Sequence, residues 1–472
     1  MNVTLVVEAD EEWTGPSETL AGHRWHISRD HNVENTIYHC VSYTWGTARS
    51  ANLFGIAGNV SSRTRGALEA AILSTSSDDS VRHKAFWIDA VCVPTEELAR
   101  RATLESMGNI YSRAQSTIVV LQSASWAIIS RDARSNVPYM ESQMDHLNQD
   151  AWVTRVWTYQ ELVNAQDLFF TAVDLPPGTR ISDEDLLNSI GLTLRRYMVH
   201  NQLPALESRR RFPALDALES ALGDRQIGFP LERSMLTCLT AIAGRDYDPA
   251  WPASRLYALL GALTQEPSWG PVDETVAALA EKAMRICEGK GDFSYIYTSD
   301  RRQVEEQRWR PRPDAGLHPI VRWNSWGERQ PGASADGKLE LHDMVRLDPD
   351  VETSPEPVAH ALRWLRGFTN LNEEALSGID ALERDLPQAL REIGFTGSAD
   401  CHRCKTGVML TQEEVEVAEG IEAYISASIR WAFGAPGIAR LKHSGTNEVR
   451  FTALVYVGTP FPDDMRRSVV LS

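Results

Sequence analysis

Short apolar runs alternate with longer amphipathic segments over residues 38–174, an order typical of a parallel sheet covered by helices. Four of the runs predict strands: residues 39–43 (HCVSY), 85–90 (AFWIDA), 117–121 (TIVVL) and 168–173 (LFFTAV). The third run is rich in β-branched residues and almost wholly apolar, as expected of a centre strand that is covered on both faces. We therefore expect an α/β domain.

The segments between these runs have the spacing of helices. Three are predicted: residues 64–73, 96–114 and 150–163. In the second, apolar residues recur mostly at three- and four-residue spacing, at Leu98, Leu104, Met107, Ile110 and Tyr111. Such spacing predicts a single helix that turns one face toward the sheet.

The rest of the chain has a different pattern. Residues 180–290 are mainly helical, with an interruption at Pro249 and Pro252, and we expect them to pack against the first domain. Beyond residue 300 the pattern predicts a small α+β region, with strands at 339–347 and 450–457 and helices at 357–366 and 420–432. The predicted domains are therefore residues 1–178, 179–300 and 301–472.

Length and charge agree with this division and restrict the partners. A chain of 472 residues is too long for one core, since single cores stop growing at roughly 250–300 residues. A net charge of -17 argues against binding to nucleic acid or to an anionic membrane surface, because both need a basic patch. The one basic run, residues 209–211, is interpreted as a solvated helix face.

The cysteines and the N-terminus favour a cytoplasmic protein. Six cysteines are too few for a disulfide scaffold in a chain of this length, so reduced thiols are expected. The first apolar run ends at Glu8 and has no basic residues before it, which argues against a signal peptide. No apolar stretch approaches the roughly 20 residues that span a bilayer.

Familiar metal and cofactor motifs give no prediction here. Cys401 and Cys404 form one C-x-x-C pair, whereas a structural zinc needs four ligands; His443 is a third candidate, but a turn without metal is the expectation. The residues around Lys290 lack the spacing of a phosphate loop, and neither G-x-S-x-G nor H-E-x-x-H occurs. We predict no metal site and no required cofactor.

Four motifs follow one another in order within residues 38–161. They are residues 38–46 (YHCVSYTWG), 86–93 (FWIDAVCV), 107–114 (MGNIYSRA) and 155–161 (RVWTYQE). Together they resemble the heterokaryon incompatibility (HET) domain of filamentous fungi, and residues 247–261 resemble the segment that follows it. The chain departs from the family pattern at Pro94-Thr95, where an Asn-Gln pair is usual, and through an insertion at residues 250–254.

HET domains in turn resemble TIR domains, which implies a TIR-like, flavodoxin-like fold. Val41-Ser42-Tyr43 is similar to the first TIR strand and Trp87-Ile88-Asp89 to the second. The spacing Trp157-x-x-x-Glu161 is similar to the motif that holds the catalytic glutamate of TIR NAD⁺ glycohydrolases. The resemblance implies Glu161 as a catalytic residue and NAD⁺ or a related nucleotide as substrate.

The chemistry of that reaction suits a glutamate. The bond from ribose to nicotinamide breaks through an oxocarbenium-like state, which a nearby carboxylate stabilises. Trp157 and Glu161 are four residues apart, so they lie on one helix face, where an indole would tend to raise the pKa of the acid. The same spacing also fits a packing tryptophan beside a capping or salt-bridged acid, with Arg155 or Arg113 as partner.

Further candidates for ligand binding leave the sheet at one edge. Asp89 closes an apolar strand, and Ser42, Tyr43 and Trp45 end the first strand at the same side. Ligands of open α/β sheets bind outside the carboxyl ends of the strands, so these residues and Trp157 are binding candidates. Alternatively, Asp89 caps the next element and Trp45 fills the core.

Two hypotheses about function follow. The first is a HET effector of self/non-self recognition or programmed cell death that consumes NAD⁺ through Glu161. The second is a non-enzymatic module that self-associates or binds an unknown protein partner, with the helix at residues 96–114 as its surface. The two differ in whether Glu161→Gln abolishes function.

Overall fold

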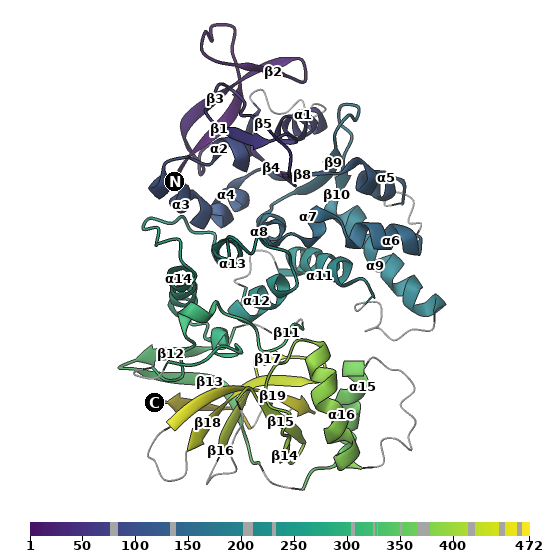
Figure 1. The fold of residues 1–472 in the computed structure, drawn as a ribbon, viewed down its shortest axis with the longest axis vertical. Helices are drawn as coiled ribbons and strands as arrows, with labels where there is room; N and C mark the ends of the chain where they lie inside the picture. Colours follow the sequence, from purple (N-terminus) through teal and green to yellow (C-terminus); the bar gives the residue numbers. More distant parts are fainter. Residues whose placement is uncertain are drawn as a thin grey trace. The chain divides into compact units, whose positions relative to one another are not determined.

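The computed structural model describes most of the chain, namely residues 1–75, 84–132, 138–201, 211–228, 233–303, 307–323, 326–327, 329–349, 352–366, 378–413, 421–442, 449–459 and 465–472. These residues divide into two compact units (Figure 1). The first unit holds the described parts of Met1–Asn201, Arg211–Leu231 and Arg245–Val272, and the second those of Glu232–Gly244 and Asp273–Ser472. The three-domain division at residues 178 and 300 stays a prediction.

The first unit is built on a mixed sheet of eight strands, in the order β10-β9-β8-β4-β7-β1-β3-β2. The strands are β1 (Asn2–Glu8), β2 (Glu18–Leu20), β3 (His23–Asn32), β4 (His39–Tyr43), β7 (Ala85–Ile88), β8 (Ser116–Leu121), β9 (Leu168–Ala172) and β10 (Ile181–Ser182). The central strands β9, β8, β4 and β7 are parallel, as expected. The outer strands pair antiparallel, so the fully parallel sheet that we predicted is only the centre of a mixed one.

Burial explains why the centre of the sheet was predicted and one border was not. Every residue of β4, β7 and β8 is buried, which gives continuous apolar runs. In β3, by contrast, Trp25 is the one buried residue and histidine, arginine and aspartate occupy much of the strand. Such a polar strand has no clear two-residue alternation, and so β3 was missed; β1 and β2 were not predicted either.

The order of the parallel strands also positions a ligand edge. Along the chain these strands run β4, β7, β8, β9, but in space they lie as β7-β4-β8-β9, so the direction of winding reverses beside β4. Ligands of open α/β sheets bind at such a reversal, outside the carboxyl ends of the strands. The residues that follow β4 therefore occupy the expected binding edge.

Eleven α-helices and one hairpin in the described part of the first unit accompany this sheet. They are α1 (Thr64–Ser74), α2 (Asp89–Cys92), α3 (Glu97–Glu105), α4 (Met107–Arg113), α5 (Ser123–Asp132), α6 (Glu141–Asn148), α7 (Ala151–Thr154), α8 (Val156–Asn164), α9 (Asp183–His200), α11 (Pro213–Gly228), α13 (Ala253–Leu263), and the hairpin β5 (Arg49–Ala51) and β6 (Asn59–Ser61).

Two of the predicted helices are each divided in two. The segment 96–114 breaks at Ser106, whose hydroxyl bonds the carbonyl oxygen of Ala102, and α3 and α4 result. The prediction of one apolar face was wrong for Leu98, which is 56% exposed on α3. The segment 150–163 breaks at Arg155, whose extended backbone separates α7 from α8.

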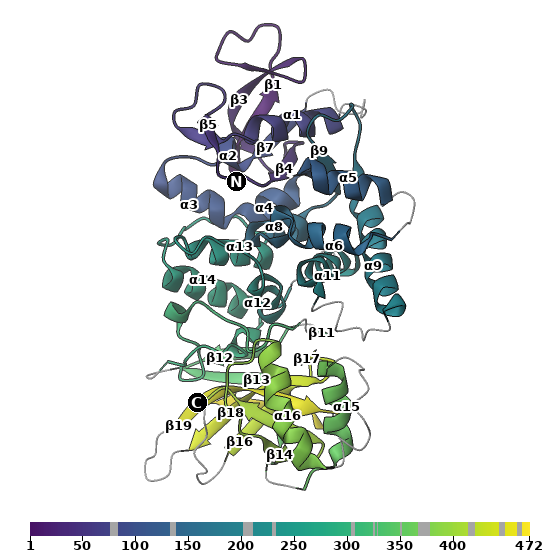
Figure 2. The same cartoon turned by 45° about the vertical axis from the view of Figure 1, so that its right-hand side comes forward.

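The helices α4, α8 and α13 lie side by side in both views (Figures 1 and 2). Glycines make this approach so close: a Cβ added to Gly108 would lie 2.2 Å from the carbonyl oxygens of Gly261 and Thr264. A Cβ on Gly261 would lie 1.5 Å from Oε1 of Gln160. Residues 245–272 of the predicted helical segment thus lie in the first unit; that the whole of residues 180–290 packs against the first domain stays a prediction.

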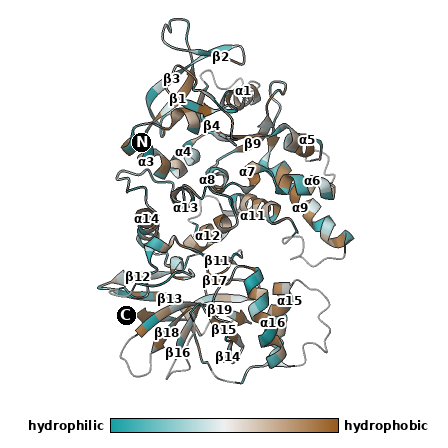
Figure 3. Ribbon diagram, in the orientation of Figure 1, coloured by the Kyte–Doolittle hydropathy of each residue, from teal (hydrophilic) through white to brown (hydrophobic). Residues whose placement is uncertain are grey.

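The second unit begins with helices and ends with an antiparallel sheet, which agrees with the expected C-terminal α+β region. Its helices are α12 (Met235–Ala243), α14 (Val276–Gly289), η1 (Ser294–Ile296), η2 (Pro313–Ala315), α15 (Pro355–Arg366) and α16 (Ile379–Glu392). The sheet order is β12-β13-β16-β18-β19-β15-β14, with β20 also paired to β13 and a small β11-β17 sheet beside it. Both α15 and α16 carry hydrophilic and hydrophobic residues, as amphipathic helices do (Figure 3).

The strands of this unit are β11 (Trp326–Gly327), β12 (Gly332–Ala335), β13 (Lys338–Leu347), β14 (His402–Cys404), β15 (Gly407–Thr411), β16 (Ile421–Ser426), β17 (Ile429–Arg430), β18 (Gly434–Lys442), β19 (Val449–Gly458) and β20 (Arg467–Leu471). The helix predicted at residues 420–432 was wrong, because β16 and β17 occupy that segment. Ala423 and Ile425 are buried while Glu422 and Tyr424 are less so, which is the two-residue period of a strand. Within the described residues, no helix is both long and apolar enough to cross a membrane.

Candidate functional site

Ser42 and Glu161 meet at the carboxyl end of β4. The hydroxyl of Ser42 donates a hydrogen bond to Oε2 of Glu161, and Nε1 of Trp152 donates to the same hydroxyl over 2.7 Å. Ser42 is 1% exposed and Glu161 6% exposed. A strand end, an α8 residue and an α7 indole therefore enclose one carboxylate.

This enclosure changes the acidity of Glu161. Burial raises its pKa to about 7, and the negative charge of Asp89 acts in the same direction. The hydrogen bond from Ser42 and the positive charge of Arg155 act the opposite way, because both favour the ionised form. A carboxyl group with such a pKa exchanges a proton near neutral pH, which is the property of catalytic acids and bases.

A second contact joins two other predicted residues, Trp45 and Asp89. Nε1 of Trp45 donates to both carboxylate oxygens of Asp89, over 3.2 and 3.1 Å. Burial raises the pKa of Asp89 above its ordinary value, although Arg155 and the backbone N–H of Ala90 lower it. Trp45 and Asp89 thus form a pair beside Ser42 and Glu161, with the two carboxyl groups acting on each other electrostatically.

Tyr43 and Trp157 point to other parts of the unit. The hydroxyl of Tyr43 is 2.7 Å from Oγ1 of Thr64 on α1. The indole of Trp157 packs against Trp251 and Tyr257, with ring centroids 5.7 and 6.3 Å apart. The indole that bonds to Ser42 beside Glu161 is instead that of Trp152, a residue that lies outside the four sequence motifs.

Three arginines gather around residues 44–46, directly after β4. The guanidinium carbons of Arg49 and Arg155 each lie 6.0 Å from the centre of the Trp45 ring. Arg63 donates to Oγ1 of Thr44 over 3.0 Å. In the part of the chain that the structure describes, none of the three forms a salt bridge with a carboxylate. The cluster is a local gathering of positive charge in a chain with a net charge of -17, and Arg155 acts electrostatically on the nearby Asp89 and Glu161.

The family comparison matches this part of the chain. Residues 38–161 match the family model of the heterokaryon incompatibility protein (HET). This segment is a HET domain. Its presence implies a role in heterokaryon incompatibility, that is, in self/non-self recognition. Comparisons with curated proteins and with solved structures found no match.

The geometry of the HET domain also bears on the alternative reading of Glu161 as a salt-bridged acid. Arg113 pairs with Glu34 over 3.1 Å. Arg155 acts on Glu161 through its charge, while its guanidinium lies over Trp45. Among the described residues, the Glu161 carboxylate therefore accepts its hydrogen bond from a neutral hydroxyl, that of Ser42.

The C-x-x-C pair lies outside the HET domain, at β14. The thiol of Cys401 donates to the carbonyl oxygens of Glu383 and Ala399, and Cys404 is buried in the core of the antiparallel sheet. Burial raises the pKa of Cys401 to about 12. Among the described residues, no group of three potential metal ligands was found. His443 and the basic residues 209 and 210 lie outside the described part of the chain.

Proposed function

We propose that this protein is a HET effector of self/non-self recognition or programmed cell death that hydrolyses NAD⁺ or a related nucleotide, with Glu161 as the catalytic carboxylate. The observation that carries the proposal is the contact of Glu161 with Ser42 at the carboxyl end of β4, beside the reversal of strand order. The resemblance of Trp157-x-x-x-Glu161 to the TIR motif supplies the reaction.

The reaction replaces one bond by another. The bond between ribose and nicotinamide breaks with its electron pair, so nicotinamide leaves as a neutral base, and water adds to the ribose carbon and gives up a proton. Positive charge develops on the ribose in between. Ionised Glu161 stabilises that charge, and Asp89 adds a second negative group nearby.

The three arginines suit the other half of the substrate. A dinucleotide carries a negatively charged diphosphate, which guanidinium groups bind through paired hydrogen bonds. Arg49, Arg63 and Arg155 form no salt bridge among the described residues, so their guanidinium groups are available to such an anion. The ring of Trp45, close to Arg49 and Arg155, offers a surface on which a base can stack.

Access to Glu161 must change before a nucleotide can reach it, because both Ser42 and Glu161 are buried. The neighbouring Trp45 and Asp89, which are bonded to each other, are only partly buried. We therefore propose that a trigger opens this contact and that the closed form is the resting state. A regulated effector of cell death would require such a state.

The first prediction tests Glu161 as a catalyst. The purified chain is incubated with NAD⁺, and released nicotinamide is measured by chromatography. The same measurement is made on cells that express the chain. Glu161→Gln keeps the size of the side chain and can still accept the bond from Ser42, so it should lower the rate by about 100-fold or more without unfolding the protein. Glu34→Gln, which changes an exposed glutamate of the same unit, should leave the rate unchanged. Equal and measurable rates for the wild type and Glu161→Gln would contradict the proposal.

A non-enzymatic role is the alternative, and one observation favours it. Leu98 is a large apolar residue that stands 56% exposed on α3, within the HET domain. If assembly through α3 causes toxicity, Leu98→Asp should abolish it, whereas Glu161→Gln should retain it. The enzymatic proposal expects Glu161→Gln to abolish toxicity together with nicotinamide release.

A further inference from the structure

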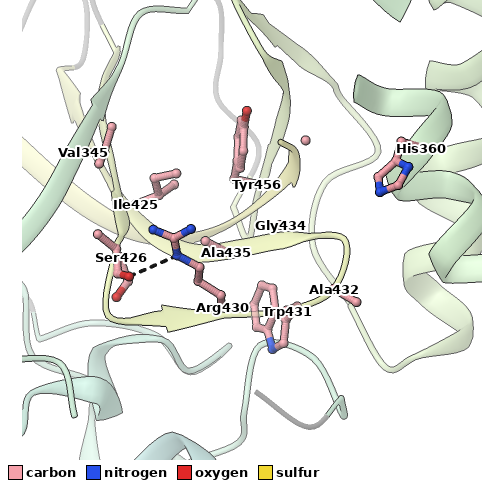
Figure 4. A pocket seen from close by; sticks show the side chains of 12 residues that line it. Val345, His360, Ile425, Ser426, Arg430, Trp431, Ala432, Gly434, Ala435 and Tyr456 are labelled. Carbon is pink, nitrogen blue, oxygen red and sulfur yellow. Dashed lines mark hydrogen bonds between the residues drawn. The ribbon is translucent and has the colours of Figure 1, made fainter. Parts of the chain in front are cut away.

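The second unit contains a cavity of about 300 Å³ on the face of its antiparallel sheet (Figure 4). Four neighbouring strands contribute to its wall: β13, β16, β18 and β19. The helix α15 adds His360 from the opposite side (Figure 4). The volume is at the lower end of the range of roughly 300–1,000 Å³ for small-molecule sites, so a small ligand fits and a dinucleotide does not.

Small residues leave this space open. Ala427, Ala432, Ala435, Gly434 and Gly458 line the cavity where larger side chains would fill it. Gly434 cannot be enlarged, since a Cβ there would lie 1.8 Å from the carbonyl oxygen of Tyr456. The close pairing of β18 with β19 therefore maintains part of the hollow.

The remaining wall is apolar and aromatic. Val345 and Ile425 supply aliphatic surface, and Trp431 and Tyr456 supply rings. All four are buried, at 4% exposure or less. These side chains belong to the core face of the sheet or continue it, so the cavity extends the hydrophobic core and favours a ligand with an apolar body.

One cation projects into this apolar setting. Nε of Arg430 donates to the carbonyl oxygen of Ala427 over 3.1 Å, which fixes the orientation of the guanidinium. Figure 4 shows that guanidinium between the side chains of Ile425, Tyr456 and Trp431. No described carboxylate forms a salt bridge with Arg430, and no lining residue is acidic. The partly buried charge is left to be balanced by a ligand.

We propose that this cavity binds a small carboxylate with a planar or branched apolar body, and that Arg430 holds the carboxylate. A guanidinium fixed at Nε still offers two terminal nitrogens, which match the two oxygens of a carboxylate. The apolar body then lies against Ile425, Trp431 and Tyr456. This site is separate from the HET domain and does not depend on the function proposed for Glu161.

The second prediction tests the ligand class. Binding of phenylacetate, indole-3-acetate and 3-methylbutyrate to the full-length protein is measured by calorimetry, with phenylacetamide as an uncharged match and phenyl phosphate as a test of the anion. At least one carboxylate should bind, and phenylacetamide at least about tenfold more weakly than phenylacetate. Binding of phenyl phosphate and of no carboxylate would reassign the anion and overturn the proposal. So would the absence of binding by all three carboxylates at millimolar concentration.

Variants decide whether the ligand occupies this cavity. Arg430→Gln should weaken carboxylate binding at least about tenfold, and Arg430→Lys should bind with intermediate strength because it keeps the charge without the paired nitrogens. Arg346→Gln removes the same charge from an exposed position on β13 and should have no effect. Ala427→Leu fills the cavity and should block binding with Arg430 in place; if Arg430→Gln does not fold, this variant gives the answer. Unchanged binding by Ala427→Leu would overturn the proposal.

Discussion

Three elements of the first unit meet at Glu161: β4 supplies Ser42, α7 supplies Trp152, and α8 carries Glu161 itself. The motif spacing placed Glu161 on a helix, and the strand pattern placed Ser42 near the end of β4. Neither pattern predicts that the two side chains meet, because their contact depends on tertiary packing, in which α8 lies against α4, α11 and α13. The third partner, Trp152, lies on a separate short helix, and its contact depends on the break at Arg155.

The arginines illustrate the same limit. Arg155 was visible in the fourth motif, but as a candidate salt-bridge partner of Glu161. Arg49 and Arg63 lie in β5 and at the start of α1, and only the turn of the chain after β4 brings them to Trp45 and Thr44. The local sequence of a loop does not predict such a long-range contact.

The third prediction concerns the proton on Glu161. Its pKa is about 7 in the folded protein and 4.5 is the ordinary value, so between these pH values the folded protein keeps a proton that the unfolded chain has lost. Stability should therefore fall as the pH rises through this window, by on the order of 3 kcal/mol. Glu161→Gln should remove that fall. Any decrease in stability caused by Asp89, whose pKa is also raised, should remain in both proteins.

Urea denaturation at about pH 5 and about pH 8, for the wild type and Glu161→Gln, measures this difference. The free energy of unfolding should decrease more for the wild type than for the variant between the two conditions. Parallel changes in both proteins would mean that Glu161 has an ordinary pKa in the folded state.

At the scale of elements, the sequence predicted best those strands that are buried on both faces. The run TIVVL is almost wholly apolar because β8 is covered on each side, and the helix α1 has its expected bounds to within a residue. The helix prediction for residues 420–432 was wrong because alanine, serine and isoleucine occur both in helices and in half-buried strands. Pairing of β16 with both β13 and β18, which is a long-range interaction, decides the outcome.

The fourth prediction concerns the contact of α4, α8 and α13. Gly108→Ala and Gly261→Ala should each destabilise the protein by about 1–3 kcal/mol. At either position the added methyl group would lie closer to neighbouring atoms than van der Waals contact allows. Gly223→Ala on α11 is the matched control. Its Cβ would have no neighbour within 4 Å, so the better helix propensity of alanine should stabilise by up to about 1 kcal/mol.

Thermal denaturation of the three variants provides the comparison. A loss of stability in Gly223→Ala equal to that of Gly108→Ala would show that helix position, and not the close approach of the backbones, controls the effect. Retained stability in both Gly108→Ala and Gly261→Ala would mean that α13 lies farther from α4 and α8 than described.

For the molecule as a whole, the fifth prediction follows from its net charge. The chain carries a net charge of -17, and the cluster of Arg49, Arg63 and Arg155 around residues 44–46 is small compared with a nucleic-acid-binding surface. Fluorescence anisotropy with a labelled DNA duplex at physiological salt should therefore show no binding. Binding that weakens steeply with added salt would reveal a basic surface and contradict this expectation.

The borders of the sheet restrict how the HET domain can be transferred between genes. Residues 38–161 include β4, β7 and β8, but β1 and β9, which pair with β7 and β8, lie outside that range, as does α13. A gene fusion that transferred only the codons for residues 38–161 would create a product with two open strand edges and an uncovered helix pair, which favour aggregation. Recombination that preserves function would have to carry the flanking codons as well.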